Sequence, residues 1–228
     1  MNKKDASKKI TGIILAAGNS IRFGKNRNKN FEKINNKPVL AYSLNMFANN
    51  NKIDNILVAA KESEIEEIKK IIEAENISKD IKIILGGKTR MESAYNCIKF
   101  ADSDIVIIQD GARPLIKEEY IEKCIEEMEN YKGVTIGVKA KDTIKVSDDS
   151  GIVKETTNRI NTWQIQTPQC FDRKILLSVH EKYGSEGATD DCSLLEKENY
   201  KVKIIDGDYS NIKITTYDDL EIVKNYLK

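Results

Sequence analysis

A basic, glycine-containing segment near the start of the chain has the residue types that bind phosphate. Residues 15–24 read LAAGNSIRFG, and six cations lie between residues 22 and 37 against one carboxylate, Glu32. These cations are Arg22, Lys25, Arg27, Lys29, Lys33 and Lys37. Small residues let backbone amides approach a phosphate closely, and cations match its charge. The dinucleotide fingerprint and the P-loop pattern are both missing. The segment predicts a nucleotide-phosphate site, with a solvated basic loop as the alternative.

A second candidate segment, residues 86–93, reads GGKTRMES. Thr89 and Glu92 have the spacing of a helix-capping box, which explains those two residues without any ligand. Capping does not explain the glycine pair Gly86 and Gly87, nor Ser93. These three residues therefore remain candidates for a binding turn.

Two further polar segments follow. Residues 110–114 read DGARP and place Asp110 and Arg113 just after an apolar run, either as an internal ion pair or as groups that face a ligand. Residues 157–169 read TNRINTWQIQTPQ, which is too polar for a central strand, so an ordered polar loop is predicted there.

The elements that must position these residues alternate between strand and helix. Five β-branched apolar runs predict strands buried on both faces, at residues 11–16, 55–60, 81–85, 105–109 and 134–138. Helical patterns occupy residues 63–75, which begin with the capping pair Ser63 and Glu66, and residues 117–131, 172–183 and 217–227, the last with Thr216 as N-cap; a late strand is expected at 201–205. This alternation predicts an α/β fold with a mostly parallel sheet, helices on both faces, and ligands at the carboxyl ends of the strands.

One segment departs from this alternation. Residues 139–165 predict a β-hairpin, with strands at 143–146 and 152–157 around a turn at 147–151. Because an isolated two-stranded hairpin is marginal in water, it needs a surface to pack against. A partner subunit is the natural candidate, and folding back over its own sheet is the alternative. We expect one domain, residues 1–228, with this arm inserted in it.

Composition excludes several function classes. The chain has 228 residues, with 37 Lys and Arg against 36 Asp and Glu, so no net field favours nucleic acid or a membrane surface. The four cysteines form no C-x-x-C pair, which indicates buried or incidental thiols in a reducing, cytoplasmic compartment. No run is apolar enough for a transmembrane helix, and a cleaved leader at residues 10–21 is disfavoured. The single histidine, His180, is expected to be solvated.

Seven motifs occur in order along the chain, from about residue 11 to residue 227: LAAGxxxRFG with Lys29, GGxxRxxS, DGARP, KDTIK, NRxxTWxxQTPQ, TDDCS and NIKIT. In this order and spacing they resemble the 2-C-methyl-D-erythritol 4-phosphate cytidylyltransferase family. The resemblance implies a Rossmann-like nucleotidyltransferase sheet with a projecting β-arm that forms a homodimer. Ribitol-5-phosphate cytidylyltransferase is the nearest rival family. A nicotinamide dehydrogenase would need a glycine fingerprint, which this sequence lacks. A non-catalytic nucleotide sensor would not need Lys213 or the arm residues.

The resemblance also implies roles for individual residues. Ala16, Ala17 and Gly18 would line the CTP pocket, Gly86, Gly87 and Ser93 would read cytosine, and Arg22, Lys29 and Lys213 would be the catalytic cations. Asp110, Thr143, Arg159 and Thr189 would bind the polyol phosphate, with Thr143 and Arg159 supplied by the partner's arm. The choice of Lys29 over Lys25 or Lys33 depends on the alignment.

The implied chemistry needs no histidine. A phosphate monoester has a second pKa of about 6, so it is largely a dianion at neutral pH and is already a nucleophile. Cations and Mg²⁺ would offset the repulsion between the two anions. Mg²⁺ binds mainly through phosphates and one or two carboxylates, and Asp110 is the best candidate protein ligand.

Overall fold

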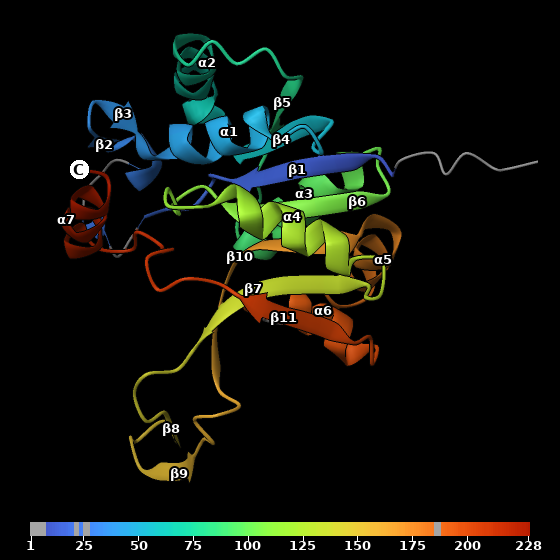
Figure 1. The fold of residues 1–228 in the computed structure, drawn as a ribbon, viewed down its shortest axis with the longest axis vertical. Coiled ribbons are helices and arrows are strands. Elements are labelled where there is room, and N and C mark those ends of the chain that lie inside the picture. The colour runs from blue at the N-terminus through green and yellow to red at the C-terminus, as the bar shows by residue number, and fades with distance from the viewer. Residues whose placement is uncertain (1–7, 21–22, 25–27, 185–187) are drawn as a thin grey trace, which may run out of the picture.

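A seven-stranded sheet forms the centre of the molecule in the computed structural model, which describes residues 8–20, 23–24, 28–184 and 188–228. The strand order is β11–β7–β10–β6–β1–β4–β5 (Figure 1). The strands are β1 (Ile10–Leu15), β4 (Asn55–Ala60), β5 (Ile81–Leu85), β6 (Ile105–Asp110), β7 (Gly133–Lys139), β10 (Trp163–Asp172) and β11 (Val202–Asp206). Only β10 pairs antiparallel with its neighbours β6 and β7, so the predicted mostly parallel sheet is confirmed.

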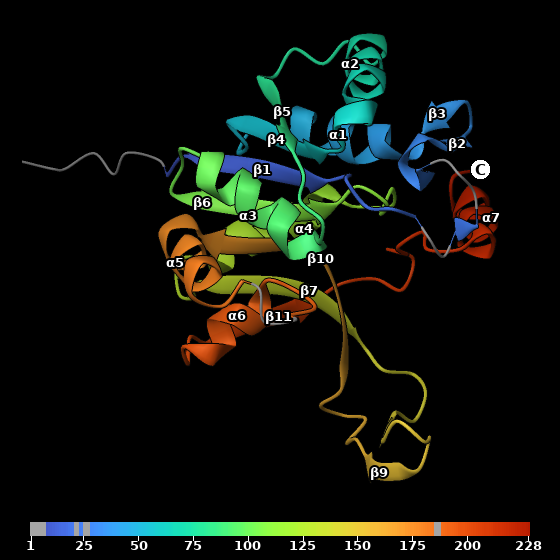
Figure 2. The same ribbon diagram turned by 180° about the vertical axis from the view of Figure 1, so that it is seen from behind.

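Helices cover both faces of this sheet, as predicted. One face packs against α1 (Val39–Asn49), α2 (Ile65–Ala74) and α4 (Glu118–Glu127), and the other against α3 (Arg90–Phe100), α5 (Arg173–Tyr183) and α6 (Cys192–Lys197) (Figure 1, Figure 2). Successive side chains of β1 point to opposite faces of the sheet. Ile14 packs in the same core as Phe47 of α1, and Ile13 packs in the same core as Ala94 of α3. The last helix, α7 (Tyr217–Tyr226), packs in a third, smaller core.

Strand β10 corrects the expectation of a polar loop, because it lies in the middle of the sheet. Two of its buried polar side chains have partners inside the protein: Gln169 donates to the Thr135 hydroxyl at 3.2 Å, and the Thr167 hydroxyl accepts from the Asp110 amide at 3.1 Å. Pro168, which has no N–H, lies where the pairing register with β7 shifts. A buried strand can be polar when its neighbours supply hydrogen-bond partners.

Three smaller expectations also change. Strand β5 is an edge strand rather than one buried on both faces, and Leu85 is 52% exposed. Helix α2 begins at Ile65, after the 3₁₀ turn η3 (Glu62–Glu64), without the side-chain cap expected from Ser63. The cap of α7 is confirmed, since the Thr216 hydroxyl accepts from the Asp219 amide in a full capping box. None of the described helices is both long and apolar enough to cross a bilayer.

His180 is buried, not solvated. It lies on α5 with 4% of its surface exposed, because its ring is paired with a buried carboxylate described below. The four cysteines are all buried free thiols, as expected. Burial raises the pKa of the Cys97 thiol to about 12, which keeps that thiol protonated.

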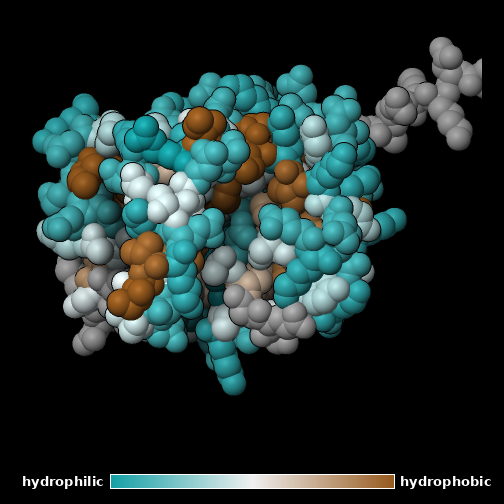
Figure 3. Space-filling view, turned by 90° about the horizontal axis from the view of Figure 1, so that it is seen from below, coloured by the Kyte–Doolittle hydropathy of each residue, from teal (hydrophilic) through white to brown (hydrophobic). Residues whose placement is uncertain are grey.

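The predicted hairpin is present and projects away from the sheet. Strands β8 (Lys145–Ser147) and β9 (Val153–Thr156) pair antiparallel in a sheet of their own, separate from the central one (Figure 1, Figure 2). Apolar side chains are exposed on this arm or beside it, and seen from the arm side, hydrophobic residues lie among the hydrophilic surface (Figure 3). They are Ile144, Val146, Ile152, Val153 and Ile160. The arm therefore does not fold back over its own sheet.

Candidate active site

A cavity of about 320 Å³ lies at the carboxyl ends of the parallel strands, where the topology predicted a ligand site. Residues from five separate stretches of the chain line it: Leu15, Ala17, Gly18, Asn19 and Ser20; Asn28, Lys29 and Asn30; Gly87, Lys88, Thr89, Arg90 and Ser93; Asp110 and Ala112; Lys213 and Thr215. Seven residues with predicted site roles are thereby brought together, namely Ala17, Gly18, Lys29, Gly87, Ser93, Asp110 and Lys213.

Two asparagines anchor the basic loop to the end of β1. The side-chain amides of Asn28 and Asn30 donate to the carbonyl of Ala16 at 2.8 and 3.1 Å, and both asparagines are buried. Asn28 also caps the short 3₁₀ helix η2 (Lys29–Phe31) by accepting from the Asn30 amide. Lys29 is thus placed at the cavity. Lys33 is exposed on β2 (Lys33–Ile34) and does not line it.

The turn between β5 and α3 packs directly against the loop after β1. A Cβ atom on Gly86 would lie 2.4 Å from the Cβ atom of Ala17, so only glycine fits this close approach. Ser93 holds the turn closed, because its hydroxyl accepts from the Gly87 amide at 3.0 Å and donates to the Thr89 carbonyl at 2.9 Å. The glycine pair and Ser93 therefore shape the cavity wall, which helix capping alone did not explain.

The capping pattern in this turn is realised in part. The Thr89 hydroxyl accepts from the Glu92 amide at 3.1 Å, and this hydrogen bond caps α3. The Glu92 carboxylate accepts from the Lys88 amide at 2.7 Å instead of returning to the cap residue. Both hydrogen bonds stabilise the turn that carries the cavity-lining residues.

Asp110 is the electrostatic centre of the cavity. Its carboxylate lies 2.8 Å from Lys213 Nζ, 3.4 Å from Arg90 Nε and 3.5 Å from Arg113 Nε. Burial by itself would raise the pKa of this carboxyl, but the three cations outweigh burial and hold that pKa well below its usual range. The Asp110–Arg113 ion pair, one of the two alternatives for this segment, is present as part of a larger cluster, and Asp110 also lines the cavity.

The segment before α7 is tied to the turn after β6, and this tie places Lys213. The Ile214 amide donates to the Ala112 carbonyl at 2.9 Å, and Arg113 Nη1 donates to the Asn211 carbonyl at 2.6 Å. Both flanks of Lys213 are thus fixed to the residues that follow Asp110. Two segments about a hundred residues apart in sequence meet at one carboxylate.

Arg90 is a cavity residue to which sequence reasoning assigned no role. Its guanidinium bridges two carboxylates, with Nη1 at 2.7 Å from Asp191 and Nε at 3.4 Å from Asp110. Burial by itself would lower the pKa of Arg90, but the two carboxylates outweigh burial and raise it. The arginine of the GGxxRxxS motif was the available signal. Its partner Asp191 lies 101 residues further along the chain.

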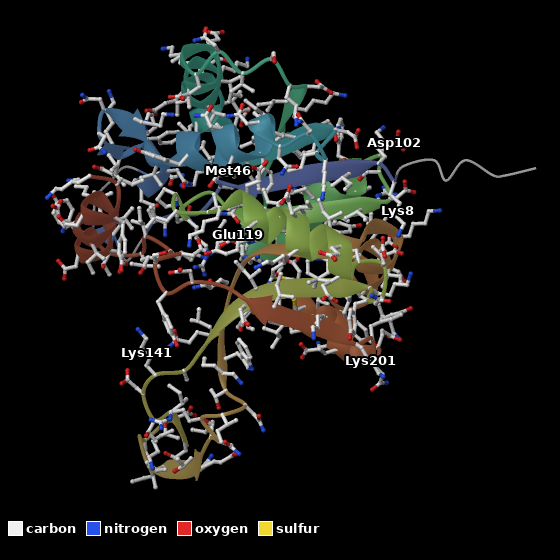
Figure 4. All side chains as sticks on the ribbon, viewed as in Figure 1. Lys8, Met46, Asp102, Glu119, Lys141 and Lys201 are labelled. Carbon is white, nitrogen blue, oxygen red and sulfur yellow. The ribbon has the colours of Figure 1, made fainter. Side chains whose placement is uncertain are left out.

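Several residues with predicted roles lie elsewhere. Thr143 and Arg159 are exposed on the arm. Lys141 marks the base of the arm, where the chain leaves the body of the molecule (Figure 4). Thr189 is exposed before α6 and does not line the cavity. Ala16 and Gly86 lie just behind the lining, and Arg22 lies outside the described residues, as do Lys25 and Arg27.

The described residues contain no cluster of three or more histidine, cysteine or acidic side chains that could hold a metal ion by themselves. Among the described cavity-lining residues, Asp110 is the one carboxylate, and its oxygens already face cations. This arrangement fits a Mg²⁺ ion held mainly by the phosphates of a ligand, with at most one protein carboxylate.

Comparisons with known proteins indicate the family of the chain. The family model for 2-C-methyl-D-erythritol 4-phosphate cytidylyltransferase matches residues 10–228. Curated proteins of that name from Caldanaerobacter subterraneus subsp. tengcongensis and Clostridium tetani are similar, at 41% identity over 96% of this chain and 99% of theirs, and at 42% over 96% and 91%.

A solved structure is also similar. The 4-diphosphocytidyl-2C-methyl-D-erythritol synthase of Anaerococcus prevotii superimposes with a TM-score of 0.86 at 36% identity, covering 97% of this chain and 99% of that one. A family match over almost the whole length, a shared fold and a shared motif order lead to one conclusion: the chain belongs to the 2-C-methyl-D-erythritol 4-phosphate cytidylyltransferase family.

Proposed function

We propose that this chain transfers the cytidylyl group of CTP to 2-C-methyl-D-erythritol 4-phosphate, a step that forms an isoprenoid precursor and releases pyrophosphate. The observation that carries the proposal is the cavity at the carboxyl end of the sheet, which Lys29 lines together with Lys213 and the buried Asp110 that Lys213 contacts. A site that joins two phosphates needs positioned cations more than it needs an acid or a base. This cavity offers such cations.

The cavity divides into a base-binding side and a phosphate-binding side. The loop of Ala16, Ala17 and Gly18 presents small residues and backbone to the triphosphate, with Lys29 from the adjoining loop and Arg22 next to it in sequence. The turn of Gly86 and Gly87, held by Ser93, forms the wall that would receive cytosine. A base bound there meets backbone groups that are fixed in place, which favours discrimination by hydrogen bonding.

The reaction is an in-line displacement. A phosphate oxygen of the polyol substrate attacks the α-phosphorus of CTP, a new P–O bond forms, and the bond to the β-phosphate oxygen breaks, its electron pair leaving on pyrophosphate. Lys29 and Lys213 stabilise the charge that grows on the phosphates. Asp110 holds Lys213 in place at 2.8 Å. When bound, Mg²⁺ supplies further neutralisation of the triphosphate, with Asp110 as its candidate protein ligand.

The polyol substrate would be held partly by a second chain. Thr143 and Arg159 lie on a projecting arm with exposed apolar residues. Such exposed apolar residues are typical of a surface that a partner covers. In a homodimer, each arm would deliver these two residues to the partner's cavity, beside Asp110. Thr189, which lies outside the cavity lining, would join them from the segment before α6. The four buried thiols support a reducing compartment, the cytoplasm, for this reaction.

The test is pyrophosphate release by the purified chain with CTP and a panel of polyol phosphates, Mg²⁺ present. Rapid release with 2-C-methyl-D-erythritol 4-phosphate, and at least about 100-fold less when ATP replaces CTP, is the expected result, because a wrong base leaves buried polar groups unpaired. Preference for ribitol 5-phosphate would overturn the substrate, and equal use of ATP would overturn the cytidylyl assignment.

A further inference from the structure

A line of polar contacts, buried at its α5 end, runs from α5 to the candidate active site. His180 Nε2 lies 2.9 Å from Asp191 Oδ1, and Asp191 Oδ2 lies 2.7 Å from Arg90 Nη1. Arg90 Nε then lies 3.4 Å from Asp110 Oδ1, and Asp110 Oδ2 lies 2.8 Å from Lys213 Nζ. Four consecutive contacts thus connect a helix on one face of the sheet to a proposed catalytic cation.

His180 and Asp191 form the inner end of this line, and burying the Asp191 carboxylate there costs free energy. The side chains of His180 and Asp191 are both fully buried, and a buried carboxylate is tolerated only where it is paired and hydrogen-bonded. Both oxygens of Asp191 have partners, one in His180 and one in Arg90. An ionised carboxylate carries no hydrogen, so His180 Nε2 must donate to it. The ring is further fixed by stacking on Tyr95, with centroids 6.0 Å apart.

The outer end of the line faces the cavity. Arg90 lines the cavity and divides its guanidinium between Asp191 and Asp110. Asp191 takes the shorter of the two Arg90 contacts, and Arg90 meets Asp110 only at Oδ1. The other oxygen of Asp110, Oδ2, contacts Lys213 at 2.8 Å and Arg113 at 3.5 Å. A change at Asp191 would redistribute the cations around Asp110 without touching any atom that meets a substrate.

We infer that His180 and Asp191 are positioning residues, which act through Arg90 to fix Asp110 and Lys213 in the geometry that the cytidylyl transfer needs. The inference rests on the proposed function of this cavity and goes beyond it, because neither residue lines the cavity. Neither residue is needed for contact with CTP or the polyol phosphate. Their loss should therefore affect kcat rather than the KM for CTP.

The experiment compares steady-state kinetics of Asp191→Asn, His180→Leu and His180→Gln. Asp191→Asn removes the charge that holds Arg90 and should lower kcat by about 10-fold or more, as loss of an outer partner of a site residue does, with the KM for CTP nearly unchanged. His180→Leu should lose about as much. His180→Gln should recover most of kcat, since an amide nitrogen at the Nε2 position can still donate to Asp191.

Arg173→Gln is the matched control. Arg173 also joins α5 to α3, by donating to the Ile98 and Lys99 carbonyls, but at the other end of α3 from Arg90. Near wild-type kcat in Arg173→Gln would exclude general loosening of these two helices. Equal losses in the control and in Asp191→Asn, no loss in Asp191→Asn, or no difference between the leucine and glutamine variants would overturn the inference.

A second readout keeps this test separate from the proposed function. The Arg90 Nε–H signal in a nitrogen-15 NMR spectrum should exchange slowly with water in the wild type and shift or broaden in Asp191→Asn, whatever the substrate proves to be. An unmoved signal would contradict the positioning role. A wild-type protein without turnover would contradict the proposed function instead.

Discussion

The cavity and the arm differ in what they bury: the cavity buries polar groups that are paired, and the arm leaves apolar side chains exposed. At the cavity, polar groups from distant segments satisfy one another, as the buried Asp110 does with Lys213, Arg90 and Arg113. On the arm, apolar side chains such as Ile152, 66% exposed, face water. The described polar groups around Asp110 are therefore satisfied within a single chain, while the arm exposes apolar side chains that its own sheet does not cover.

The largest effect is expected inside the cavity, at the basic loop. Lys29→Ala should lower kcat by at least about 100-fold, the size typical of removing one group that stabilises transition-state charge. Lys33→Ala is the matched control, because Lys33 belongs to the same basic stretch but is exposed outside the cavity. Pyrophosphate release by both variants decides the matter. Near wild-type turnover of folded Lys29→Ala would move the catalytic role to another loop lysine.

A smaller but specific effect is expected on the arm. Arg159→Lys keeps the charge but loses the planar fork that binds phosphate through two parallel hydrogen bonds, so kcat/KM for the polyol phosphate should fall by about 10-fold. The KM for CTP should stay close to the wild-type value. Substrate titrations at saturating CTP measure the first quantity, and wild-type values in Arg159→Lys would remove Arg159 from the site.

The arm surface itself should matter for association and not for the stability of one chain. Ile152→Asp places a charge on a side chain that is already exposed, so the free energy of unfolding should change by no more than about 0.5 kcal/mol. If a partner covers the arm, the dimer dissociation constant should rise by about 10-fold or more.

Phe100→Asp is the control for this surface effect, because Phe100 is also exposed, at 53%, but lies at the end of α3. Sedimentation velocity over a range of concentrations measures the dissociation constant of each variant. An unchanged constant in Ile152→Asp, or an equal rise in Phe100→Asp, would count against the arm as the dimer surface.

The smallest effect on activity is expected for Lys79, a structural cation at the end of α1 that belongs neither to the cavity nor to the arm. Lys79 Nζ donates to the carbonyls of Phe47, Asn50 and Ile53 at 3.2, 2.6 and 2.6 Å, and so satisfies the end of α1. Lys79→Met should cost about 1–2 kcal/mol of unfolding free energy and lower Tm by a few degrees, with kcat unchanged. Calorimetry and the activity assay together check this, and a large loss of kcat would show that α1 supports the site.

Local patterns in the sequence predicted the sheet and part of the helix layers. β-Branched apolar runs gave the mostly parallel sheet, helical periodicity gave α2, α4 and α5, and Thr216 marked the start of α7, whereas α1, α3 and α6 were not predicted as helices. These features depend on residues that are close in sequence. The position of the hairpin was also predictable, because turn residues separate its two strands.

Features that depend on distant partners were not predictable from local pattern. Strand β10 was too polar to be recognised, since Gln169 is paired by Thr135, on another strand. His180 could not be placed in the core without its partner Asp191, which follows 11 residues later in the sequence. Motif resemblance pointed to cavity residues such as Ser93 and Lys213, but the geometry that joins Lys213 to Asp110 required the fold.

A subunit-mixing experiment tests most directly whether each active site is shared between two chains. Lys29→Ala damages the cavity and Arg159→Ala damages the arm, and each pure variant should be nearly inactive. After subunit exchange at equal amounts, about a quarter of all sites should be intact, because about half of the dimers are mixed and each mixed dimer regenerates one complete site. The account predicts that activity returns to about a quarter of the wild-type value. A mixture that stays inactive although mixed dimers are shown to form, or a wild-type chain that is monomeric under assay conditions, would contradict it.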